Sequence, residues 1–200
     1  MTAAETWLSY TIRMTDIKET QETRPIMPGT EDSDRPLVEL THVEKHYGDL
    51  HVLKDINLTV KKGEVLVIVG PSGSGKSTTG RAIAGLQKVS GGSLNVLGVE
   101  MNGVKERQFK PKRADIGFVF QDPGSSFNPL MTIAENVAEP LIVHKKYSSV
   151  SEASDYVGDL LEMVQLPRTY MNRFPHELSG GQRQRASLAR ALALKPSLLI

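Results

Sequence analysis

The 200-residue sequence contains no cysteine. A disulfide and a metal site built on thiolates are therefore excluded, and the absence fits a reducing compartment. No run of about 18 apolar residues occurs, so we expect no helix that crosses a membrane. The first residues also lack a basic start followed by an apolar stretch, so we expect no signal peptide and a cytoplasmic location.

An excess of one charge is lacking as well. The sequence has 24 Lys and Arg against 23 Asp and Glu, which gives a formal charge of +1. This balance gives no reason to expect nucleic acid or anionic lipid as the main partner. The hydrophobic share of 39% and the charged share of 24% are typical of a soluble globular protein. A chain of this length can bury a sizeable core.

The first 36 residues lack a sustained hydrophobic period and carry mainly Thr, Glu, Asp and Pro with scattered apolar residues. This composition predicts a flexible leader or linker over residues 1–36. From Leu37 onward apolar residues recur at strand and helix spacing, so we expect one folded domain over residues 37–200.

A glycine-rich segment, GPSGSGKS at residues 70–77, matches the P-loop pattern G-x-x-x-x-G-K-[ST]. Its glycines let the backbone adopt positive φ and direct N–H groups at phosphate oxygens. Lys76 can reach the β- and γ-phosphates, and the Ser77 hydroxyl can bind Mg²⁺. A plain turn with an exposed lysine is the alternative. We expect a nucleoside triphosphate to be bound by Gly70, Pro71, Ser72, Gly73, Ser74, Gly75, Lys76, Ser77 and Thr78.

The flanks of this segment support the same interpretation. The apolar residues 65–69 predict a buried strand before the loop, and residues 78–84 favour a helix after it. The N-terminal end of a helix favours an anion because it carries partial positive charge. Strand, loop and helix in this order are the context that the P-loop pattern requires.

Other strands are indicated by alternating apolar residues. They are expected over 37–43, 56–60 and 91–98, with a turn at 61–64 that feeds the strand before the P-loop. The basic stretch at 105–113 predicts a solvated connector.

Two kinds of side chain near the first two strands have a functional interpretation. Tyr47 could stack on an adenine ring, or it could be an ordinary packing residue beside a turn. His42 and His46 are four residues apart, but they lie on strand-like sequence without an H-E-x-x-H pattern. We therefore expect no zinc site there, and the sequence shows no other metal cluster.

The apolar run at 116–120 predicts a buried strand that is followed directly by Gln121. Open α/β sheets bind ligands just beyond the carboxyl ends of their parallel strands. Gln121 is therefore a candidate for orienting Mg²⁺ or a water molecule. An ordinary turn residue is the equally weighted alternative.

From Ser125 onward the pattern becomes helical. Capping boxes are predicted at 132–135 and 149–152, and Pro140 is expected to break or kink the first of these helices. The second box precedes apolar residues at helical spacing. These residues are Ala153, Val157, Leu160, Leu161 and Val164.

The sequence LSGGQ at residues 178–182 leads into a strong helix-forming stretch over 183–194. Ser179 and Gln182 can form a capping box without any ligand. Gly180 and Gly181 cost about 1 kcal/mol each relative to Ala in a helix, which makes more sense if another group approaches this backbone closely. A helix N-terminus without Cβ atoms is a suitable anion site.

Taken together, residues 70–77, Gln121 and LSGGQ at 178–182 resemble the nucleotide-binding domain of an ABC transporter. The resemblance runs from about Leu37 to Ile200. It implies a P-loop NTPase of the α/β class, with a parallel core sheet and a smaller antiparallel β part near the adenine. It also implies a helical subdomain insert at about residues 125–185.

The resemblance implies roles for single residues, with ATP and Mg²⁺ as cofactors. Tyr47 is similar to the aromatic residue that stacks on adenine. Gln121 would sense Mg²⁺ and the γ-phosphate, so it joins Lys76 as a catalytic candidate and Ser77 as a metal candidate. The residues that would close on the ATP of a partner copy are Ser179, Gly180, Gly181 and Gln182.

Partners are implied by the same resemblance. Two nucleotide-binding domains, identical or different, face each other head to tail with ATP between them. The helical subdomain contacts permease subunits in the membrane, and an extracytoplasmic solute-binding protein takes part indirectly. The chain is therefore expected on the cytoplasmic face of the cell membrane, where ATP hydrolysis powers transport.

Two stretches, QDPGSSFNP at 121–129 and FPHE at 174–177, resemble the peptide and nickel import branch. One departure is large, because the family's strand that begins at 198–200 continues into an Asp that holds Mg²⁺ and a Glu that acts as general base. This sequence stops at Ile200, before both. We therefore expect these 200 residues to bind ATP but to hydrolyse it poorly.

Two other functions stay open at this stage. The first is a soluble ABC-type ATPase of the tandem translation-factor or DNA-repair type. The DNA-associated kinds usually carry a long insertion between P-loop and signature, whereas only a compact helical segment lies there in this sequence. The second is an unrelated P-loop kinase or GTPase, which would leave LSGGQ unexplained.

Overall fold

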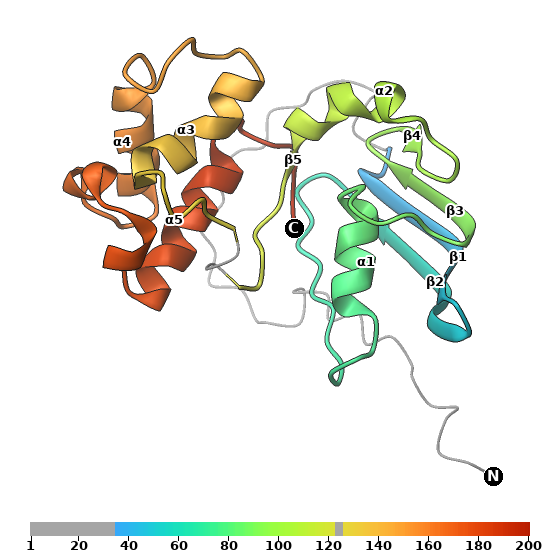
Figure 1. Cartoon of the computed structure of the whole chain (residues 1–200). Helices are drawn as coiled ribbons and strands as arrows, with labels where there is room; N and C mark the ends of the chain where they lie inside the picture. Colours follow the sequence, from blue (N-terminus) through green and yellow to red (C-terminus); the bar gives the residue numbers. More distant parts are fainter. Residues whose placement is uncertain (1–34, 123–125) are drawn as a thin grey trace, which may run out of the picture. The chain divides into compact units, whose positions relative to one another are not determined.

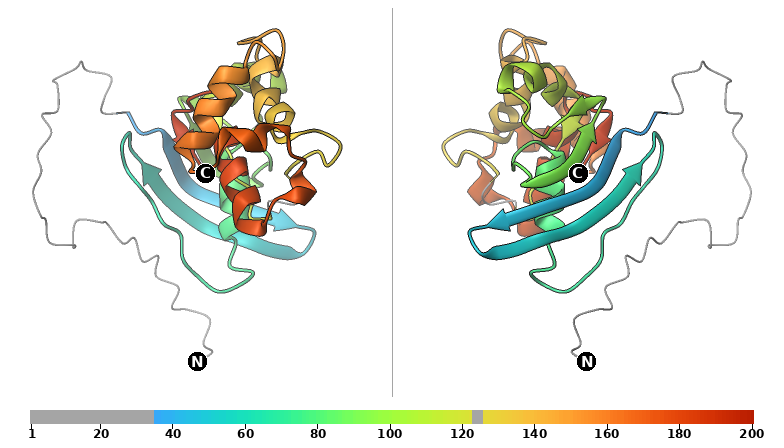
Figure 2. Two further views of the ribbon diagram at one scale, coloured as in Figure 1. Left: turned by 90° about the vertical axis from the view of Figure 1, so that its left-hand side faces the viewer. Right: turned by 90° about the vertical axis from the view of Figure 1, so that its right-hand side faces the viewer.

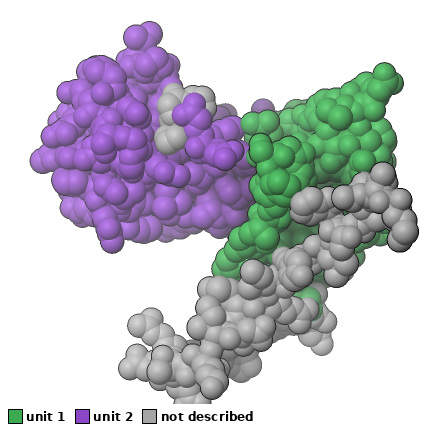
Figure 3. Space-filling view, turned by 90° about the horizontal axis from the view of Figure 1, so that it is seen from below, with its two compact units in different colours: residues 1–109 green, residues 110–200 purple. Residues whose placement is uncertain are grey.

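The computed structural model describes residues 35–122 and 126–200 (Figure 1). The leader predicted over residues 1–36 lies almost entirely outside the described residues, as do Pro123, Gly124 and Ser125. The chain divides into two compact units, which Figure 3 shows in different colours. Unit 1 ends at Phe109, and unit 2 spans Lys110–Ile200.

Unit 1 contains a four-stranded antiparallel sheet with the order β2-β1-β3-β4. Alternate residues of its strands, among them Val38, Leu40 and Leu94, are buried, as expected for a sheet with one face on a core. Figure 2 shows β1 and β2 as a long curved ribbon. The three predicted strands are confirmed, and the first two are longer than expected. Their bounds are Val38–Tyr47 for β1, Leu50–Val60 for β2, Gly91–Val96 for β3 and Val99–Glu100 for β4.

The predicted helix after the glycine-rich segment is confirmed. It is α1, Lys76–Ile83, and it buries Thr79, Ala82 and Ile83. Further along, the basic stretch forms the short helix α2, Glu106–Phe109, and the 3-10 helix η2, Lys110–Asp115. This stretch is only partly solvated, because Phe109 is 1% exposed.

The buried strand predicted over residues 65–69 is wrong. These residues form no strand in the described part of unit 1, and Val65, Val67 and Val69 are more than half exposed. A strand needs a neighbour for its backbone hydrogen bonds. The paired strands of unit 1 are β1 to β4, so residues 65–69 lack such a neighbour within the unit. Residues 66–69 instead line a cavity of about 140 Å³ with Ile56 and Leu58 of β2.

Unit 2 combines a parallel pair of strands with a group of helices. The pair is β5, Ile116–Gly117, and β6, Leu198–Leu199. The strand predicted over 116–120 is confirmed only at its start, since Phe120 is 38% exposed. The helices are α3, Ile133–Val143, α4, Ser154–Met163, and α5, Gly180–Leu192, with the 3-10 helices η4, Arg168–Asn172, and η5, Pro175–Glu177.

The core of unit 2 lies between α3, α4 and α5. The apolar residues predicted at helical spacing are all buried there, from Ala153 at 0% to Val164 at 6% exposure. They meet Ile133, Val137 and Leu141 from α3, and Ala186, Ala189 and Ala193 from α5 and its end. Antiparallel sheet, parallel strand pair and helical group confirm the predicted α/β fold class.

The first capping box predicted in unit 2 is confirmed. Thr132 accepts a hydrogen bond from the Glu135 backbone, and the Glu135 carboxylate accepts one from the Thr132 N–H at 2.6 Å. The second box forms only in part. The Glu152 N–H donates to the Ser149 hydroxyl, but its carboxylate accepts from the Ser148 N–H. These hydrogen bonds therefore stabilise a turn, and α4 begins after this turn, at Ser154.

Pro140 does not break α3, which continues to Val143. The His144 N–H still donates to the Pro140 carbonyl at 3.0 Å. Pro140 lies in the last part of the helix, so its missing N–H removes a single ladder bond and the buried contacts of Val137 and Leu141 outweigh that loss.

Among the described residues, no helix is both long enough and apolar enough to cross a membrane.

Candidate functional site

The glycine-rich segment in unit 1 forms a tight loop into the start of α1. Gly73 and Gly75 have φ values of 81° and 87°, in the left-handed region that favours glycine. A Cβ atom on Gly75 would lie 2.6 Å from Leu53 Cδ2 and 3.2 Å from the Val52 carbonyl oxygen in β2. Glycine at 75 is therefore required both by the backbone conformation and by the close approach of β2.

Lys76 directs its ammonium group back over this loop. Its Nζ donates to the carbonyl oxygens of Gly70 at 2.8 Å and Pro71 at 2.6 Å, and to the Ser74 hydroxyl at 3.2 Å. One lysine cation thus lies against the backbone that the glycines curve. An ammonium group bound in this way is a compact point charge that can exchange carbonyl oxygens for phosphate oxygens.

The first turn of α1 supplies hydroxyl groups beside this cation. Ser77 is exposed, and Thr78 is half-buried. Thr79 has another role, because its buried hydroxyl donates to the Gly75 carbonyl at 3.0 Å and fixes the loop to the helix. Pro71, Ser72 and Ser74 are exposed, and the Ser74 N–H donates to Pro71. The structure therefore gathers the predicted residues 70–78 at one helix N-terminus.

Tyr47 lies at the end of β1, where its partner in β2 is Leu50. Its side chain is 47% exposed, and the ammonium of Lys45 lies 4.7 Å from its ring centre. The ring is thus available for contact with another flat group. Along β2, this position is a few residues from Val52 and Leu53, against which Gly75 packs.

The predicted signature segment lies at the start of α5 in unit 2. Ser179 accepts from the Gln182 backbone N–H, and the Gln182 side chain accepts from the Ser179 N–H at 2.8 Å, so the capping box is confirmed. A Cβ atom on Gly180 or Gly181 would meet no atom of residues 35–122 or 126–200 within 4 Å. Packing within the described part of the chain therefore does not require glycine at either position.

Two residues that the sequence analysis did not single out hold the signature segment in place. The Gln182 amide donates to the Tyr170 hydroxyl at 3.2 Å. Arg183 donates to the carbonyl of Leu178 at 3.0 Å. Tyr170 comes from η4, twelve residues away in sequence, and no local pattern predicts that contact.

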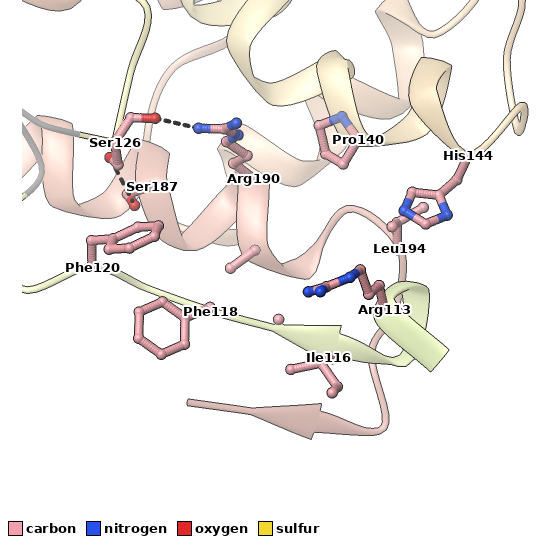
Figure 4. Close-up of a pocket in the computed structure, with 12 residues that line it drawn as sticks. Arg113, Ile116, Phe118, Phe120, Ser126, Pro140, His144, Ser187, Arg190 and Leu194 are labelled. Atoms are coloured by element: carbon pink, nitrogen blue, oxygen red, sulfur yellow. Dashed lines mark hydrogen bonds between the residues drawn. The ribbon is translucent and has the colours of Figure 1, made fainter. Parts of the chain in front are cut away.

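Gln121 is exposed and follows the parallel strand β5 and Phe120. Unit 2 also contains a cavity of about 220 Å³ between β5, α3 and α5, which is lined by Phe120, the residue before Gln121 (Figure 4). Phe118 and Phe120 lie on one side of this cavity, and Arg190 reaches in from α5. The Arg190 guanidinium donates to the Ser126 carbonyl, which lies just after the Gln121 segment.

Arg183 and Arg190 lie on one helix, and the sequence analysis singled out neither. Seven residues separate them on α5, which puts both on one face of the helix. Both side chains are half-buried, and each guanidinium group donates to a backbone carbonyl. The partners themselves, backbone carbonyls in distant segments, are visible only in the structure.

No metal cluster was expected from the sequence, but the hairpin of β1 and β2 brings three possible metal-ligand side chains together. One candidate ligand atom from each of Glu44, His46 and His51 lies within 4.8 Å of the others. His51 also contacts the Glu44 carboxylate. A hydrogen bond from the Asp55 backbone N–H is the main factor that lowers the pKa of Glu44. His42 is not part of this group, since it pairs with Asp55.

A model of the family described as "ABC transporter" matches residues 53–200. The chain is 41% identical over 172 residues to the oligopeptide transport ATP-binding protein OppF of Bacillus subtilis, with 82% of this chain covered. It is 44% identical over 151 residues to OppF of Escherichia coli, with 76% covered. The chain spans 55% and 45% of these two relatives, or about half their length.

Solved structures agree with this similarity. The chain superimposes on the ATP-binding cassette MJ0796, described as a dimer in a post-hydrolysis state bound to ADP and Pi, with a TM-score of 0.73 and 39% identity. That match covers 81% of this chain and 72% of the other. A second dimeric structure of the same cassette gives a TM-score of 0.74.

Proposed function

The chain belongs to the ABC transporter family, and on that premise we propose that it is the nucleotide-binding part of an ATPase subunit that powers peptide import. The observation that carries the proposal is the Lys76 ammonium held over a glycine-curved loop at the N-terminus of α1. In such a site, several backbone N–H groups and one cation can bind the same anion. The named relatives, which are oligopeptide transport ATP-binding proteins, support peptides as the cargo class.

We assign the triphosphate to residues 70–78 and the adenine ring to Tyr47, whose half-exposed ring supports stacking. The Ser77 hydroxyl, exposed beside Lys76 in the first turn of α1, fits an oxygen ligand for Mg²⁺. Mg²⁺ held there by Ser77 would offset the negative charge of the phosphate oxygens. Gln121 is assigned to the same metal and γ-phosphate.

A second copy is assigned to the other side of the nucleotide. Ser179, Gly180, Gly181 and Gln182 present a helix N-terminus without Cβ atoms in the way, which suits close approach to the ATP of the partner copy. The dimeric cassette in the solved relative supports this arrangement. Tyr170 and Arg183 hold the segment in place.

The same proposal covers organisation and location. The nucleotide-binding domain spans residues 37–200, the helical part at about 125–185 contacts permease subunits, and residues 1–36 are a leader or linker. A solute-binding protein outside the cell delivers the peptide. The subunit then works at the cytoplasmic face of the membrane.

The phosphate assignment is tested with Lys76→Ala in the complete subunit. We expect no binding of labelled ATP, because the loop loses its only lysine cation, while Lys62→Ala in the exposed turn before the loop binds normally. Wild-type affinity in Lys76→Ala would contradict the assignment.

The two-sided site is tested with Ser179→Arg. Binding of ATP to a monomer should persist, whereas ATP-dependent dimers measured by light scattering should be lost. Ser151→Arg, in an exposed turn before α4, should leave the dimers intact. Unchanged dimers of Ser179→Arg would remove the signature from the proposed site.

The cargo is tested in a strain that lacks the complete gene. Uptake of a labelled oligopeptide should be lost, restored by the wild-type gene and not restored by Lys76→Ala. Peptide uptake that survives the deletion would overturn peptide import. If the deletion abolishes uptake of labelled nickel instead, nickel and not peptide is the cargo.

A further inference from the structure

Three side chains that bind metals well meet on one face of the β1–β2 hairpin. His46 in β1 is directly opposite His51 in β2, so their Cβ atoms belong to neighbouring positions across the ladder. Glu44 lies two residues before His46 and therefore on the same face. The two imidazole rings are stacked with their centres 3.9 Å apart, and His51 Nε2 contacts the Glu44 carboxylate.

The carboxylate of Glu44 is oriented by a fixed backbone donor. The Asp55 N–H donates to Glu44 Oε1 at 2.9 Å, which turns the other oxygen, Oε2, toward His51. The residue opposite Glu44 in β3 is Gly91, where a Cβ atom would lie 3.4 Å from Glu44 Cβ. The glycine thus leaves room for the Glu44 side chain at its base.

The backbone under the two β1 residues is fixed from a third segment. The His46 N–H donates to the Ser90 hydroxyl at 3.0 Å, and the Ser90 N–H donates to the Glu44 carbonyl at 2.8 Å. Ser90 precedes β3, so a residue from outside the hairpin ties both positions down. These bonds hold the backbone of both residues and so fix the positions from which their side chains extend.

We propose that Glu44, His46 and His51 form a binding site for a divalent late transition-metal ion of the Zn²⁺, Co²⁺ or Ni²⁺ class. Two imidazole nitrogens and one carboxylate oxygen suit these ions, whereas Mg²⁺ and Ca²⁺ take oxygen ligands. Zinc sites with three protein ligands keep the fourth position for water or another ligand.

The geometry requires a small rearrangement of side chains only. At Zn–N distances near 2.05 Å, two ligands of a tetrahedral ion lie roughly 3.3 Å apart. The three ligand atoms here are already within 4.8 Å of one another. Because His46 is exposed and His51 is half-buried, both rings can turn from the stacked arrangement so that their nitrogens face Glu44 Oε2.

This site shares no residue with the phosphate-binding loop, so its test needs no nucleotide. His46 directly precedes Tyr47, the residue assigned to adenine. A bound ion would therefore fix the end of β1 that carries Tyr47. The sequence contains no cysteine, so no thiolate competes with the two histidines for the ion.

Titration calorimetry of the untagged full chain with ZnCl₂, in the presence of millimolar Mg²⁺, tests the proposal. We expect one high-affinity ion per chain. The double variant His46→Ala/His51→Ala should bind at least about tenfold more weakly, and Glu44→Gln, whose amide oxygen can still accept from Asp55, should also lose about tenfold. The matched controls His176→Ala and His144→Ala should keep wild-type affinity.

Equal affinity in the double variant would overturn the proposal, as would no binding of Zn²⁺, Co²⁺ or Ni²⁺ to the wild type. If circular dichroism shows that the double variant is unfolded, an NMR titration of the wild type with Ni²⁺ tests the site instead. Substoichiometric Ni²⁺ should broaden the NMR ring signals of His46 and His51 first. Broadening centred on His42 or His176 would place the ion elsewhere and refute the site.

Discussion

The guanidinium of Arg190 in α5 lies 2.5 Å from the carboxylate of Glu139 in α3, measured from Nη2 to Oε2. The other terminal nitrogen of Arg190 donates to the Ser126 carbonyl. One side chain thus connects the helix that begins at the signature segment to α3 and to the chain that follows Gln121. The Ser126 hydroxyl adds a weaker contact with Ser187 at 3.4 Å.

Replacing Arg190 should therefore cost more stability than replacing its acidic partner. Both side chains of the pair are about a third or more exposed, so the ion pair itself contributes less than about 1 kcal/mol. Arg190→Met also removes the donor to a backbone carbonyl, so we expect a loss of about 1–3 kcal/mol against less than about 1 kcal/mol for Glu139→Gln.

Urea unfolding followed by circular dichroism measures both values. Arg185→Ala, an exposed arginine on the same helix, is the control and should change stability little. Equal losses in Arg190→Met and Glu139→Gln would mean that the contact with Ser126 contributes nothing.

Glycines in the two candidate segments should respond in opposite ways to alanine. Gly75→Ala forces a left-handed φ on a residue with a Cβ and brings that atom against Leu53 and Val52, so we expect a loss of about 1–3 kcal/mol. The methyl group of Gly180→Ala meets no atom of the described residues and adds a helix former, so stability should be unchanged or rise by up to about 1 kcal/mol.

Thermal unfolding of the two glycine variants, compared with their ATP-dependent dimerisation, distinguishes an effect on stability from an effect on function. ATP-dependent dimers should weaken in Gly180→Ala although its melting temperature does not fall, because the added methyl group lies where the partner's nucleotide would approach. A Gly180→Ala variant that melts earlier than the wild type would show that glycine is needed for packing there.

Packing in the helical core of unit 2 predicts that truncation of the Leu161 side chain lowers stability strongly. Its side chain is 0% exposed between α3, α4 and α5, so Leu161→Ala should destabilise unit 2 by about 2–5 kcal/mol. Met163 is two residues away and 67% exposed, and Met163→Ala should cost less than about 1 kcal/mol. Similar denaturation midpoints for the two variants would contradict the packing described here.

The capping box of α3 predicts a pH dependence. Hydrogen bonds from the backbone and then from the hydroxyl of Thr132 lower the pKa of Glu135 below its ordinary value of 4.5. A carboxyl group whose folded pKa is depressed stabilises the fold fully above its unfolded pKa and loses this contribution as pH falls through the folded value. The contribution of Glu135 to the free energy of unfolding should therefore be constant near neutral pH. It should decrease as the pH is lowered from about 4.5.

Acid titration of the wild type and Glu135→Gln tests this dependence. The difference in melting temperature between them should shrink as the pH drops, because the wild type loses the charge that the variant lacks. A difference that stays constant from pH 7 to about pH 3 would show that the Glu135 charge adds nothing to the cap.

The sequence predicted an element correctly where the residues that stabilise that element all lie in one short segment. The P-loop glycines, the capping boxes at Thr132 and Ser179, and the helical spacing from Ala153 to Val164 depend on residues a few positions apart, and the structure has each of these elements. The same holds for the strands β1, β2 and β3, whose alternation is visible within each run.

Signals failed where the cause lies in a distant segment. Residues 65–69 are as apolar as a buried strand, yet a strand forms only beside a hydrogen-bonding neighbour, and unit 1 offers none to them. Pro140 is tolerated because contacts from other helices hold α3. Tyr170, Arg190 and the group at His51 were missed because each depends on partners brought together by folding.

The sequence by itself therefore determined the family, the phosphate-binding loop and the signature helix, since their chemistry is written in contiguous residues. Only the tertiary structure decided which side chains hold these segments and that Glu44, His46 and His51 share one face, because strand register and helix packing set contacts that no single segment encodes.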